Sequence, residues 1–495
     1  MHCDAPCRMP QIGALAFGDF PSIRTSPSGQ ERTMATRPRG FDETADLVIV
    51  GAGMAGFCCA IEAANLGATV ILLEKEAETG GSSRLSGGSF AFAGTDQQEA
   101  AGIEDDSPRM LEDLRRVGQH KNNEALLRAF GDAQLDTWRW LQSLGLTFGS
   151  PKAGSGQSVP RTHRADPVGM FGLLGNAGAR SGRVRLLCQT EATRLPRADG
   201  EVSGVQAAQG NRALTIGANR AVVLATGGFM RGEALLENFA PGQAQALRMG
   251  AAGCTGDGLR MAWQLGADLR DMGYIRGTFG IHPGSGPEDH HFLHSIYLGA
   301  IAVNRAGHRF VDESLSYKLV GDACLRQPGA IGFQVFDQTV MDRSPADGSS
   351  FDAAAELRAG RLIAGASIQA LAERLGIDSA GLAATLRRYN ADVARGEDSV
   401  FGRTSLTAGW GKPSPIERAP FYAFPSRSAV VGTYCGLVVD ERLRVHDVFG
   451  DPIGNLLAAG HVTGGFHGAG YMTGTALSKA AVFGRLAARS AMMPR

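Results

Sequence analysis

The sequence lacks long apolar runs, paired cysteine motifs and an excess of either charge. Its longest apolar stretch, residues 47–61, is interrupted by glycine and is shorter than the ~20 residues that a membrane-spanning helix requires. The eight cysteines form no CxxC pair, haem-attachment motif or Cys/His zinc pattern, which argues against a disulfide framework and favours a reducing, cytoplasmic location. Lysine plus arginine and aspartate plus glutamate both total 49, so the charge gives no reason to expect binding to nucleic acid or to an anionic membrane.

Glycine, in contrast, is abundant: 68 of the 495 residues are glycine, against an ordinary share of ~7%. The glycines cluster in short loops without a collagen-like period, and such loops let the backbone approach a ligand closely. With 43% hydrophobic residues the chain can bury a large core. Residues 288–294 combine acidic and histidine side chains, but the preceding Pro287 and glycines indicate a polar surface loop, and we expect no metal site.

Residues 1–40 contain prolines and serines without sustained periodicity, and we expect them to form a disordered N-terminal tail. They contain no basic segment followed by an apolar stretch, so a secretory signal is not expected. Met34 is an alternative to Met1 as the start, because the first strand pattern begins soon after it.

The first ordered pattern is an apolar strand that begins at Asp46 and runs into a GxGxxG loop and a helix. In this pattern Gly51 makes the turn, Gly53 lets the backbone approach a pyrophosphate, and Gly56 packs the helix on the strand. The phosphates would lie at the helix N-terminus, and Glu74, at the end of the next strand, would bind the ribose hydroxyls. The segment therefore predicts a βαβ dinucleotide-binding unit.

Further glycine-rich loops lie toward both ends of the chain. They are at residues 80–88, 225–228, 255–258 and 460–477. A cofactor domain built from both ends must be discontinuous, with an inserted middle. We expect an α/β fold in which residues 41–270 and 427–495 form a Rossmann-like cofactor-binding domain and residues 271–426 form an inserted α+β capping domain. Helices are expected in the cap near residues 360–375 and 379–396.

Taken together, these motifs resemble the fumarate reductase and 3-ketosteroid dehydrogenase group of FAD flavoproteins, over roughly residues 45–490. The matching segments are VGAGMAG, EKEAETGGSS, SVPRTHR at 158–164, ATGGF, TGDG, HP at 282–283, GHRFVDES at 307–314 and AAGHVTGGFHGAGYMTGTAL. The resemblance implies that the cofactor domain binds FAD and that a substrate is held between this domain and the cap, against the isoalloxazine ring. One branch of the family attaches flavin through a histidine. The corresponding residues 82–86 contain none, so we expect FAD to be noncovalent.

The residues expected to contact FAD belong to the glycine-rich loops, the strand ends and the start of the last helix. They are Gly51, Gly53, Ala55, Gly56, Glu74, Lys75, Gly81, Ser82, Ser83, Ser86, Gly87, Gly88, Ala192, Ala225, Thr226, Gly227, Asp257, Gly460, His461, Thr475, Ala476 and Leu477. In this family a glutamate that contacts the FAD ribose usually follows AAG. This sequence has His461 at that position instead. The N–H groups of residues 475–477, together with the helix dipole, would favour negative charge at the flavin N1–O2 edge.

The family divides by its active-site residues, and this chain resembles the ketosteroid branch. Fumarate reductases place an arginine acid shortly after the RF-x-(N/D)-E motif, where this sequence has Tyr317. In place of their HGANR substrate clamp it has HGAGY, which ends at Tyr471, and residues 430–436 lack the histidines of their HHTMGG stretch. The replacements are similar to those of the ketosteroid enzymes, which desaturate ring ketones.

Carried over by position, Tyr471 would donate to the substrate carbonyl, helped by a backbone N–H at Gly474 or Thr475. Tyr317 would remove the α proton while flavin N5 takes hydride from the β carbon. Donors aimed at the developing enolate oxygen lower such a barrier by roughly 3–4 kcal/mol each. A tyrosine has a pKa of about 10, so Tyr317 needs a neighbour or the flavin to lower it. We therefore predict α,β-dehydrogenation of a cyclic ketone, such as a 3-ketosteroid or a cyclohexanone-type ring.

Several assignments stay open. Arg161 and His163 could contact the flavin or the substrate, or lie in a solvated loop, and His282, held extended by Pro283, could line the pocket or form a turn. An alternative function is fumarate reductase-like reduction of an α,β-unsaturated carboxylate, with Arg161 or Arg276 as the clamp; another is noncatalytic flavin binding or redox sensing. The net direction of the reaction also stays open. Because no second GxGxxG follows a strand and no redox CxxC is present, we expect a small carbonyl substrate and an external electron acceptor or donor.

Overall fold

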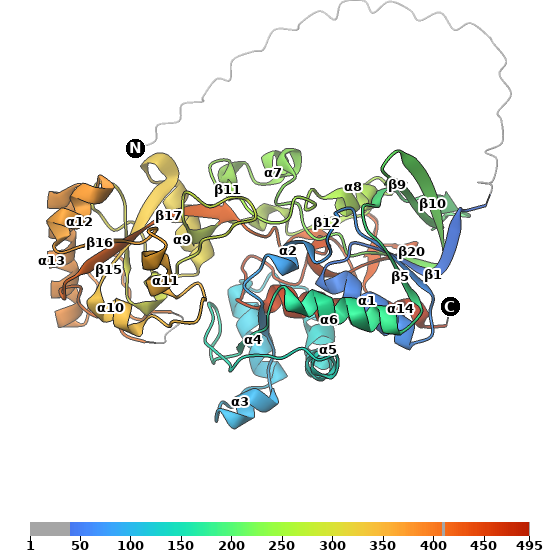
Figure 1. Ribbon diagram of the computed structural model, residues 1–495, viewed down its shortest axis with the longest axis horizontal. Coiled ribbons are helices and arrows are strands. Elements are labelled where there is room, and N and C mark those ends of the chain that lie inside the picture. Colours follow the sequence, from blue (N-terminus) through green and yellow to red (C-terminus); the bar gives the residue numbers. More distant parts are fainter. Residues whose placement is uncertain (1–39, 408–410, 495) are drawn as a thin grey trace, which may run out of the picture. The chain divides into compact units, whose positions relative to one another are not determined.

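The computed structural model describes residues 40–407 and 411–494 (Figure 1). The tail expected at residues 1–40 therefore lies outside the described residues, apart from Gly40. Within them, strand β1 (Glu43–Val50), helix α1 (Met54–Asn65) and strand β2 (Val70–Leu73) follow one another, and β1 and β2 are parallel. This is the βαβ unit that the fingerprint predicts, and the mixed α/β fold class is confirmed.

The larger sheet joins segments from both ends of the described chain. Its strands run in the order β19-β20-β10-β1-β2-β5, with β9 beside β10 and β6 beside β9. The strands added here are β5 (Val184–Leu187), β6 (Glu191–Arg194), β9 (Gly204–Gln209), β10 (Arg212–Leu224), β19 (Arg444–His446) and β20 (Pro452–Ala458). Five consecutive strands, from β20 to β5, are parallel to one another, as in a dinucleotide-binding fold.

A second sheet runs in the order β11-β17-β15-β14, with β13 and β16 also paired to β17. Its strands are β11 (Leu247–Arg248), β13 (Thr278–Ile281), β14 (Ile301–Val303), β15 (Ile331–Asp337), β16 (Ile363–Gly365) and β17 (Phe421–Val430). Helix α13 (Ser379–Arg395) agrees with the sequence pattern, but α12 begins only at Ile368, because β16 occupies the start of the expected helix. Strand β17 continues across the proposed boundary after residue 426, and the domain limits stay a prediction.

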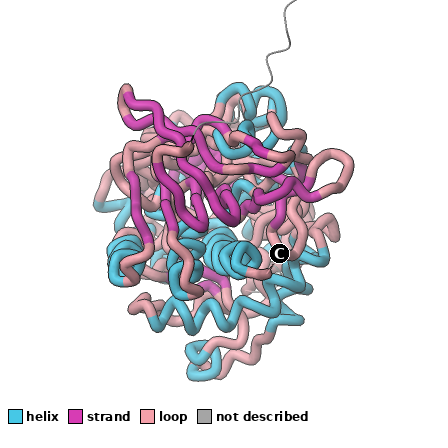
Figure 2. The backbone as a smooth tube through the Cα atoms, turned by 90° about the vertical axis from the view of Figure 1, so that its right-hand side faces the viewer, coloured by secondary structure: helices cyan, strands magenta, loops and turns pink. Residues whose placement is uncertain are grey.

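The remaining elements connect and cover these sheets. They are α2 (Gly81–Arg84), α3 (Asp96–Ala100), α4 (Ser107–Val117), α5 (Glu124–Ser143), α6 (Gly169–Arg180), α7 (Glu233–Phe239), α8 (Asp257–Trp263), α9 (Tyr317–Leu325), α10 (Gln338–Arg343), α11 (Ala353–Arg358), α12 (Ile368–Leu375), α14 (Thr475–Met492) and the strands β3 (Ser89–Ala91), β4 (Thr162–Arg164), β7 (Arg197–Ala198), β8 (Glu201–Val202), β12 (Leu269–Arg270) and β18 (Gly436–Leu437). Figure 2 shows strands gathered in a layer with helices packed against it. None of the helices in the described ranges is both long and apolar enough to cross a membrane.

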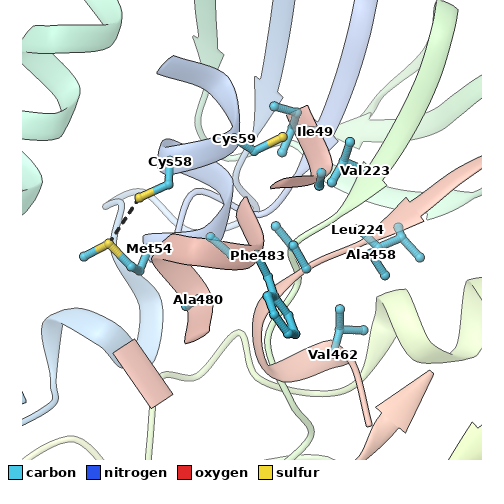
Figure 3. Close-up of a cluster of buried hydrophobic side chains, with 14 of the residues drawn as sticks. Ile49, Met54, Cys58, Cys59, Val223, Leu224, Ala458, Val462, Ala480 and Phe483 are labelled. Carbon is cyan, nitrogen blue, oxygen red and sulfur yellow. Dashed lines mark hydrogen bonds between the residues drawn. The ribbon is translucent and has the colours of Figure 1, made fainter. Parts of the chain in front are cut away.

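The core under the larger sheet is centred on the contact between α1 and α14 (Figure 3). Fully buried side chains such as Ile49, Cys58 and Phe483 pack there, and burial removes their apolar surface from water. The two helices approach very closely at Gly484. A Cβ atom added at this glycine would lie 2.3 Å from the carbonyl oxygen of Ala55, so only glycine permits this packing.

Replacing Gly484 with alanine is expected to lower the free energy of unfolding by about 1–3 kcal/mol, the usual effect of overpacking a core. The matched control is Gly172→Ala in α6, where an added Cβ meets no atom within 4 Å and alanine is the better helix former. Urea unfolding of the FAD-loaded proteins, followed by circular dichroism, measures both changes. Equal unfolding midpoints for the two variants would contradict the close helix approach.

Candidate active site

A cavity of about 1150 Å³ is lined by residues from the GxGxxG loop, from the loop before α14 and from segments around the second sheet. Gly53 and Glu74 line it in the βαβ unit, and Tyr317 and Phe351 line it from the predicted cap. A cavity of this size, lined by glycine-rich loops and by both apolar and polar side chains, is the usual form of a cofactor and substrate site.

The N-terminus of α1 is suited to a pyrophosphate. Its N-cap residue is Gly53, no side chain caps the helix, and residues 53–55 line the cavity. The first N–H groups of such a helix lack partners, and the helix dipole favours an anion there. Gly56 has another role, because a Cβ atom there would lie 1.8 Å from the carbonyl oxygen of Gly51. The fingerprint glycines therefore divide between ligand approach and packing, as their spacing predicts.

The polar groups near this helix also fit a dinucleotide. The buried carboxylate of Glu74 accepts a hydrogen bond from the Ala52 N–H at 3.0 Å and faces the cavity. Burial raises its pKa, although N–H groups of Glu76 and Ala52 act in the opposite direction. Among the described residues, Thr226 Oγ1 and His461 Nε2 are buried without a hydrogen-bond partner, and both residues line the cavity. Such atoms are normally satisfied, so a ligand with hydroxyl and phosphate groups suits them.

Of the residues predicted to contact FAD, all but Gly56, Gly88 and Thr475 line the cavity. Gly88 packs where a Cβ atom would lie 2.1 Å from the Ala165 carbonyl oxygen, and Thr475 is buried with its hydroxyl donating to the Met472 carbonyl at 2.6 Å. These three therefore support the loops around the cavity.

The RFVDE motif holds the segment that leads into α9. Arg309 and Arg403 both pair with the fully buried Glu313, and Glu313 also accepts the Ala302 N–H at 3.0 Å. Ser316 then caps the helix, so that Tyr317 is its first residue. This buried ion cluster fixes the point at which Tyr317 enters the cavity.

The structure brings the two predicted catalytic tyrosines to one cavity. Tyr317 reaches it from the start of α9, and its hydroxyl lies 3.3 Å from Thr473 Oγ1. Tyr471 lies in the loop before α14, where its ring stacks on Tyr434 with a centroid distance of 4.3 Å. Gly474, the N-cap of α14, also lines the cavity, and its φ of 85° favours glycine.

The surroundings of these tyrosines favour the neutral hydroxyl. Burial, together with the nearby Tyr471, raises the pKa of Tyr317 well above its usual value, although Thr473 acts against this. Burial also raises the pKa of Tyr471 to about 12, against the N–H groups of Ala476 and Gly474. A neutral Tyr471 suits a hydrogen-bond donor. For Tyr317 the described residues do not supply the lowered pKa that a base requires.

The tentative substrate contacts Arg161 and His163 do not reach the cavity. Arg161, directly before β4, and His163 within it alternate with Thr162 and Arg164, which do line the cavity, because successive side chains of extended backbone point to opposite faces. Arg161 is fully buried and donates to Asp105 at 2.7 and 2.9 Å, and it also pairs with Asp113. Neither of the two possibilities left open for Arg161 and His163, a cavity contact or a solvated loop, matches their burial here.

The histidines of the predicted cap lie in two different surroundings. His282 is absent from the cavity lining; its ring lies 5.5 Å from that of Phe424, and its Nδ1 accepts the Gly284 N–H. His294, expected in a polar surface loop, is buried and stacks on Tyr317 with a centroid distance of 5.3 Å. Burial lowers its pKa to about 4, so it is neutral at physiological pH. In the part of the chain that the structure describes, no three metal-binding side chains are grouped to hold an ion.

Sequence reasoning missed several lining residues. Tyr434 and Tyr297 add two further tyrosines to the cavity wall, and Lys152 and Arg164 add two exposed cations. Arg164 donates to backbone carbonyls, including that of Gly87 at 3.1 Å, while Lys152 pairs with Asp347. Arg164 lay in a segment already matched to the family, at residues 158–164, and Tyr434 lay in the stretch compared with it, at residues 430–436.

The fold and the site define a dinucleotide-binding protein in which the predicted cofactor and substrate residues line one cavity. The FAD binding domain family matches residues 46–477, and the chain belongs to this family. It is an FAD-dependent oxidoreductase, as the sequence predicts.

Three comparisons describe its relatives. A fumarate reductase (cytochrome) of Shewanella frigidimarina is 32% identical over 96% of this chain and 81% of its own. A 4-oxocyclohexanecarboxylate 2-dehydrogenase of Sinomonas cyclohexanicum is 30% identical over 90% of this chain and 92% of its own. The structure of a 3-ketosteroid-delta4-(5alpha)-dehydrogenase from Rhodococcus jostii RHA1 is 25% identical, with a TM-score of 0.75, and covers 93% of this chain and 99% of that one. The resemblance to both branches of the family is confirmed.

Proposed function

We propose that this oxidoreductase desaturates a cyclic ketone between its α and β carbons. The observation that carries the proposal is the meeting of Tyr317, Tyr471 and Gly474 at one cavity with the cofactor-binding loops. At the two positions where fumarate reductases resemble one another in having arginine, this chain has the hydroxyl groups of Tyr317 and Tyr471. A hydroxyl cannot neutralise a carboxylate as arginine does, whereas it can donate to a ketone. The relative from Sinomonas cyclohexanicum, a ring-ketone dehydrogenase by name, supports the same substrate class.

In this proposal the residues of the chain handle the proton and the carbonyl. FAD, when bound, supplies the acceptor for the hydride of the β carbon. The Tyr471 hydroxyl donates to the ketone oxygen, where a neutral donor stabilises developing negative charge. Tyr317 receives the α proton, which requires that its pKa fall when substrate and cofactor fill the cavity, because burial alone raises it.

A second candidate is the reduction of an α,β-unsaturated carboxylate. Arg164 and Lys152 line the same cavity and could bind a carboxylate, and the Shewanella frigidimarina relative is a fumarate reductase by name. The two arginines suggested by the sequence do not serve, because Arg161 is buried against Asp105 and Arg276 pairs with Asp322 at 3.2 Å, both outside the cavity lining.

Anaerobic mixing of the oxidised FAD protein with a panel of ring ketones and saturated carboxylates separates the two functions. The proposal expects a ring ketone to bleach the flavin absorbance, and steady turnover when a dye is added as acceptor. Turnover of fumarate with reduced viologen, but of no ketone with a dye, would favour the second candidate. We also propose an external electron partner in the cytoplasm, so NADPH alone should leave the flavin oxidised; rapid bleaching by NADPH would contradict this part.

A further inference from the structure

Lys318 is a buried cation that the proposed chemistry does not use. It is the second residue of α9 and is only 3% exposed. Its Nζ donates to the Arg276 carbonyl at 3.1 Å, and no carboxylate within 4.0 Å pairs with it among the described residues. The nearest acid along its helix, Asp322, pairs instead with the Arg276 side chain. A buried, unneutralised lysine is costly, and such groups gather at functional sites.

The Lys318 ammonium group lies over the ring of a cavity-lining tyrosine. Its Nζ is 4.9 Å from the ring centroid of Tyr434, within the range of a cation–π contact. Tyr434 has a φ of 55°, a conformation that residues other than glycine seldom adopt. Such a backbone persists only where the surroundings hold it, and the lysine is one of the groups that hold this ring.

Tyr434 connects the lysine to the proposed carbonyl donor. Its ring stacks on that of Tyr471 with planes 22° apart. The Tyr471 hydroxyl lies near the N–H groups of Gly474 and Ala476, at the start of α14. A series of contacts therefore runs from Lys318 through Tyr434 to Tyr471.

Burial shifts the pKa of several titratable groups around this series toward their neutral forms. Burial lowers the pKa of His461 to about 3 and that of His467 well below its usual value. Burial also lowers the pKa of Lys318 to about 7, opposed by Asp322, and that of Lys479 to about 7, opposed by Asp271. The titratable and charged groups around Lys318, Tyr434 and Tyr471 are the following: Asp322 on α9, Arg276 before β13, His461 and His467 in the loop before α14, Lys479 on α14, and Asp271.

We propose that Lys318 is a positioning residue for Tyr471, acting through Tyr434. Its ammonium group holds the Tyr434 ring against Tyr471 and places a positive charge behind the hydroxyl that faces the ketone oxygen. A positive charge there stabilises the enolate as it forms, and no reorganisation is needed because the group is already in place. This role rests on the proposed ketone chemistry.

The sign of the pH dependence follows from the charged form. Lys318 carries its charge below its folded pKa and loses it as the pH rises through about 7. The ratio of wild-type to Lys318→Met turnover is therefore expected to be roughly tenfold at about pH 6 and to approach one at about pH 9. In Lys318→Arg, whose charge persists over this range, the ratio to Lys318→Met should stay high at both values. Because Lys479 is present in every variant, its titration cancels from these ratios.

The test compares Lys318→Met, Lys318→Arg and Tyr434→Phe with Lys412→Met, an exposed lysine outside the cavity lining. Turnover is measured across this pH range with the ketone and dye, and flavin content and thermal stability show whether each variant has folded. Tyr434→Phe keeps the ring and should retain most of the Lys318 effect, whereas in a Tyr434→Leu background, which has no ring to hold, the Lys318→Met change should have a smaller effect. A Lys318→Met enzyme with wild-type turnover and an unchanged pH profile would overturn the proposal.

A binding measurement separates this inference from the proposed function. Nitrophenol resembles an enolate, and its absorbance reports whether it binds ionised. The wild-type protein should lower the pKa of bound nitrophenol more than Lys318→Met does, while Lys412→Met matches the wild type. If no ketone is turned over but this difference is found, the proposed function fails and the inference stands. If ketones are turned over and the difference is absent, the inference fails alone.

Discussion

Phenylalanine at Tyr317 or Tyr471 is expected to lower turnover of a ring ketone by on the order of 10²-fold or more, the usual scale for one general base or one oxyanion donor. Each change removes a single oxygen, so the fold and the flavin spectrum should be retained. Steady-state kinetics with the ketone and a dye measure the loss. The double variant should lose less than the product of the two single losses if the hydroxyl groups act as one unit.

Tyr274→Phe is the matched control, because this exposed tyrosine lies outside the cavity lining. It should keep wild-type turnover. Full activity of Tyr317→Phe or Tyr471→Phe, with flavin bound, would remove that tyrosine from the mechanism and favour the carboxylate reductase instead. Loss of flavin from either variant would show a structural role, which the geometry does not require.

Arg161→Met is expected to lower the free energy of unfolding by about 3–5 kcal/mol, because it leaves the buried carboxylates of Asp105 and Asp113 without their shared partner. Arg164→Met, at the exposed end of β4 and on the opposite side from Arg161, is the control and should leave stability nearly unchanged. Denaturant unfolding of the FAD-loaded proteins compares them. Similar midpoints would show that the buried ion cluster contributes little.

The same variant should also change the acid sensitivity of the fold. Burial alone would raise the pKa of Asp113, but hydrogen bonds from Arg116, Ser158 and Arg161 hold it below its usual value. A carboxylate with a lowered folded pKa stabilises the protein above its unfolded pKa, and this stability is lost as the pH falls through the folded value. Without Arg161 the folded pKa rises, so acid unfolding should begin at a higher pH than in the wild type.

Local patterns in the sequence predicted the cofactor unit well, for a physical reason. The spacing of Gly51, Gly53 and Gly56 is dictated by contacts within one strand–turn–helix segment, and Gly56 does pack against Gly51. The approach of Tyr317 and Tyr471 could also be foreseen, through the family motifs that flank each of them. The cofactor unit depends on residues that are close in the sequence, whereas the approach of the two tyrosines, which lie far apart in the chain, could be foreseen only through the family resemblance.

Features set by long-range packing could not be read in this way. The face of β4 that carries Arg161 is decided by Asp105 and Asp113, which lie about 50 residues earlier. Similarly, β16 forms where helix was expected because it pairs with β17, almost 60 residues later. The burial of His294 depends on its stacking against Tyr317, and no polar loop pattern reveals such a partner.

The joining of both ends in one sheet has a consequence for synthesis. Strand β1 is synthesised well before the elements that pack against it. Its neighbour β10 ends at Leu224. Helix α14 begins only at Thr475, and this helix covers α1 and lines the cofactor cavity. At ~5–20 residues per second, the interval between β1 and α14 is on the order of half a minute or longer. During that time the nascent chain exposes an apolar helix face and unpaired strand edges. The cofactor cavity is therefore completed only after α14 has been synthesised, and a limited supply of flavin would leave this surface open to chaperones and proteases.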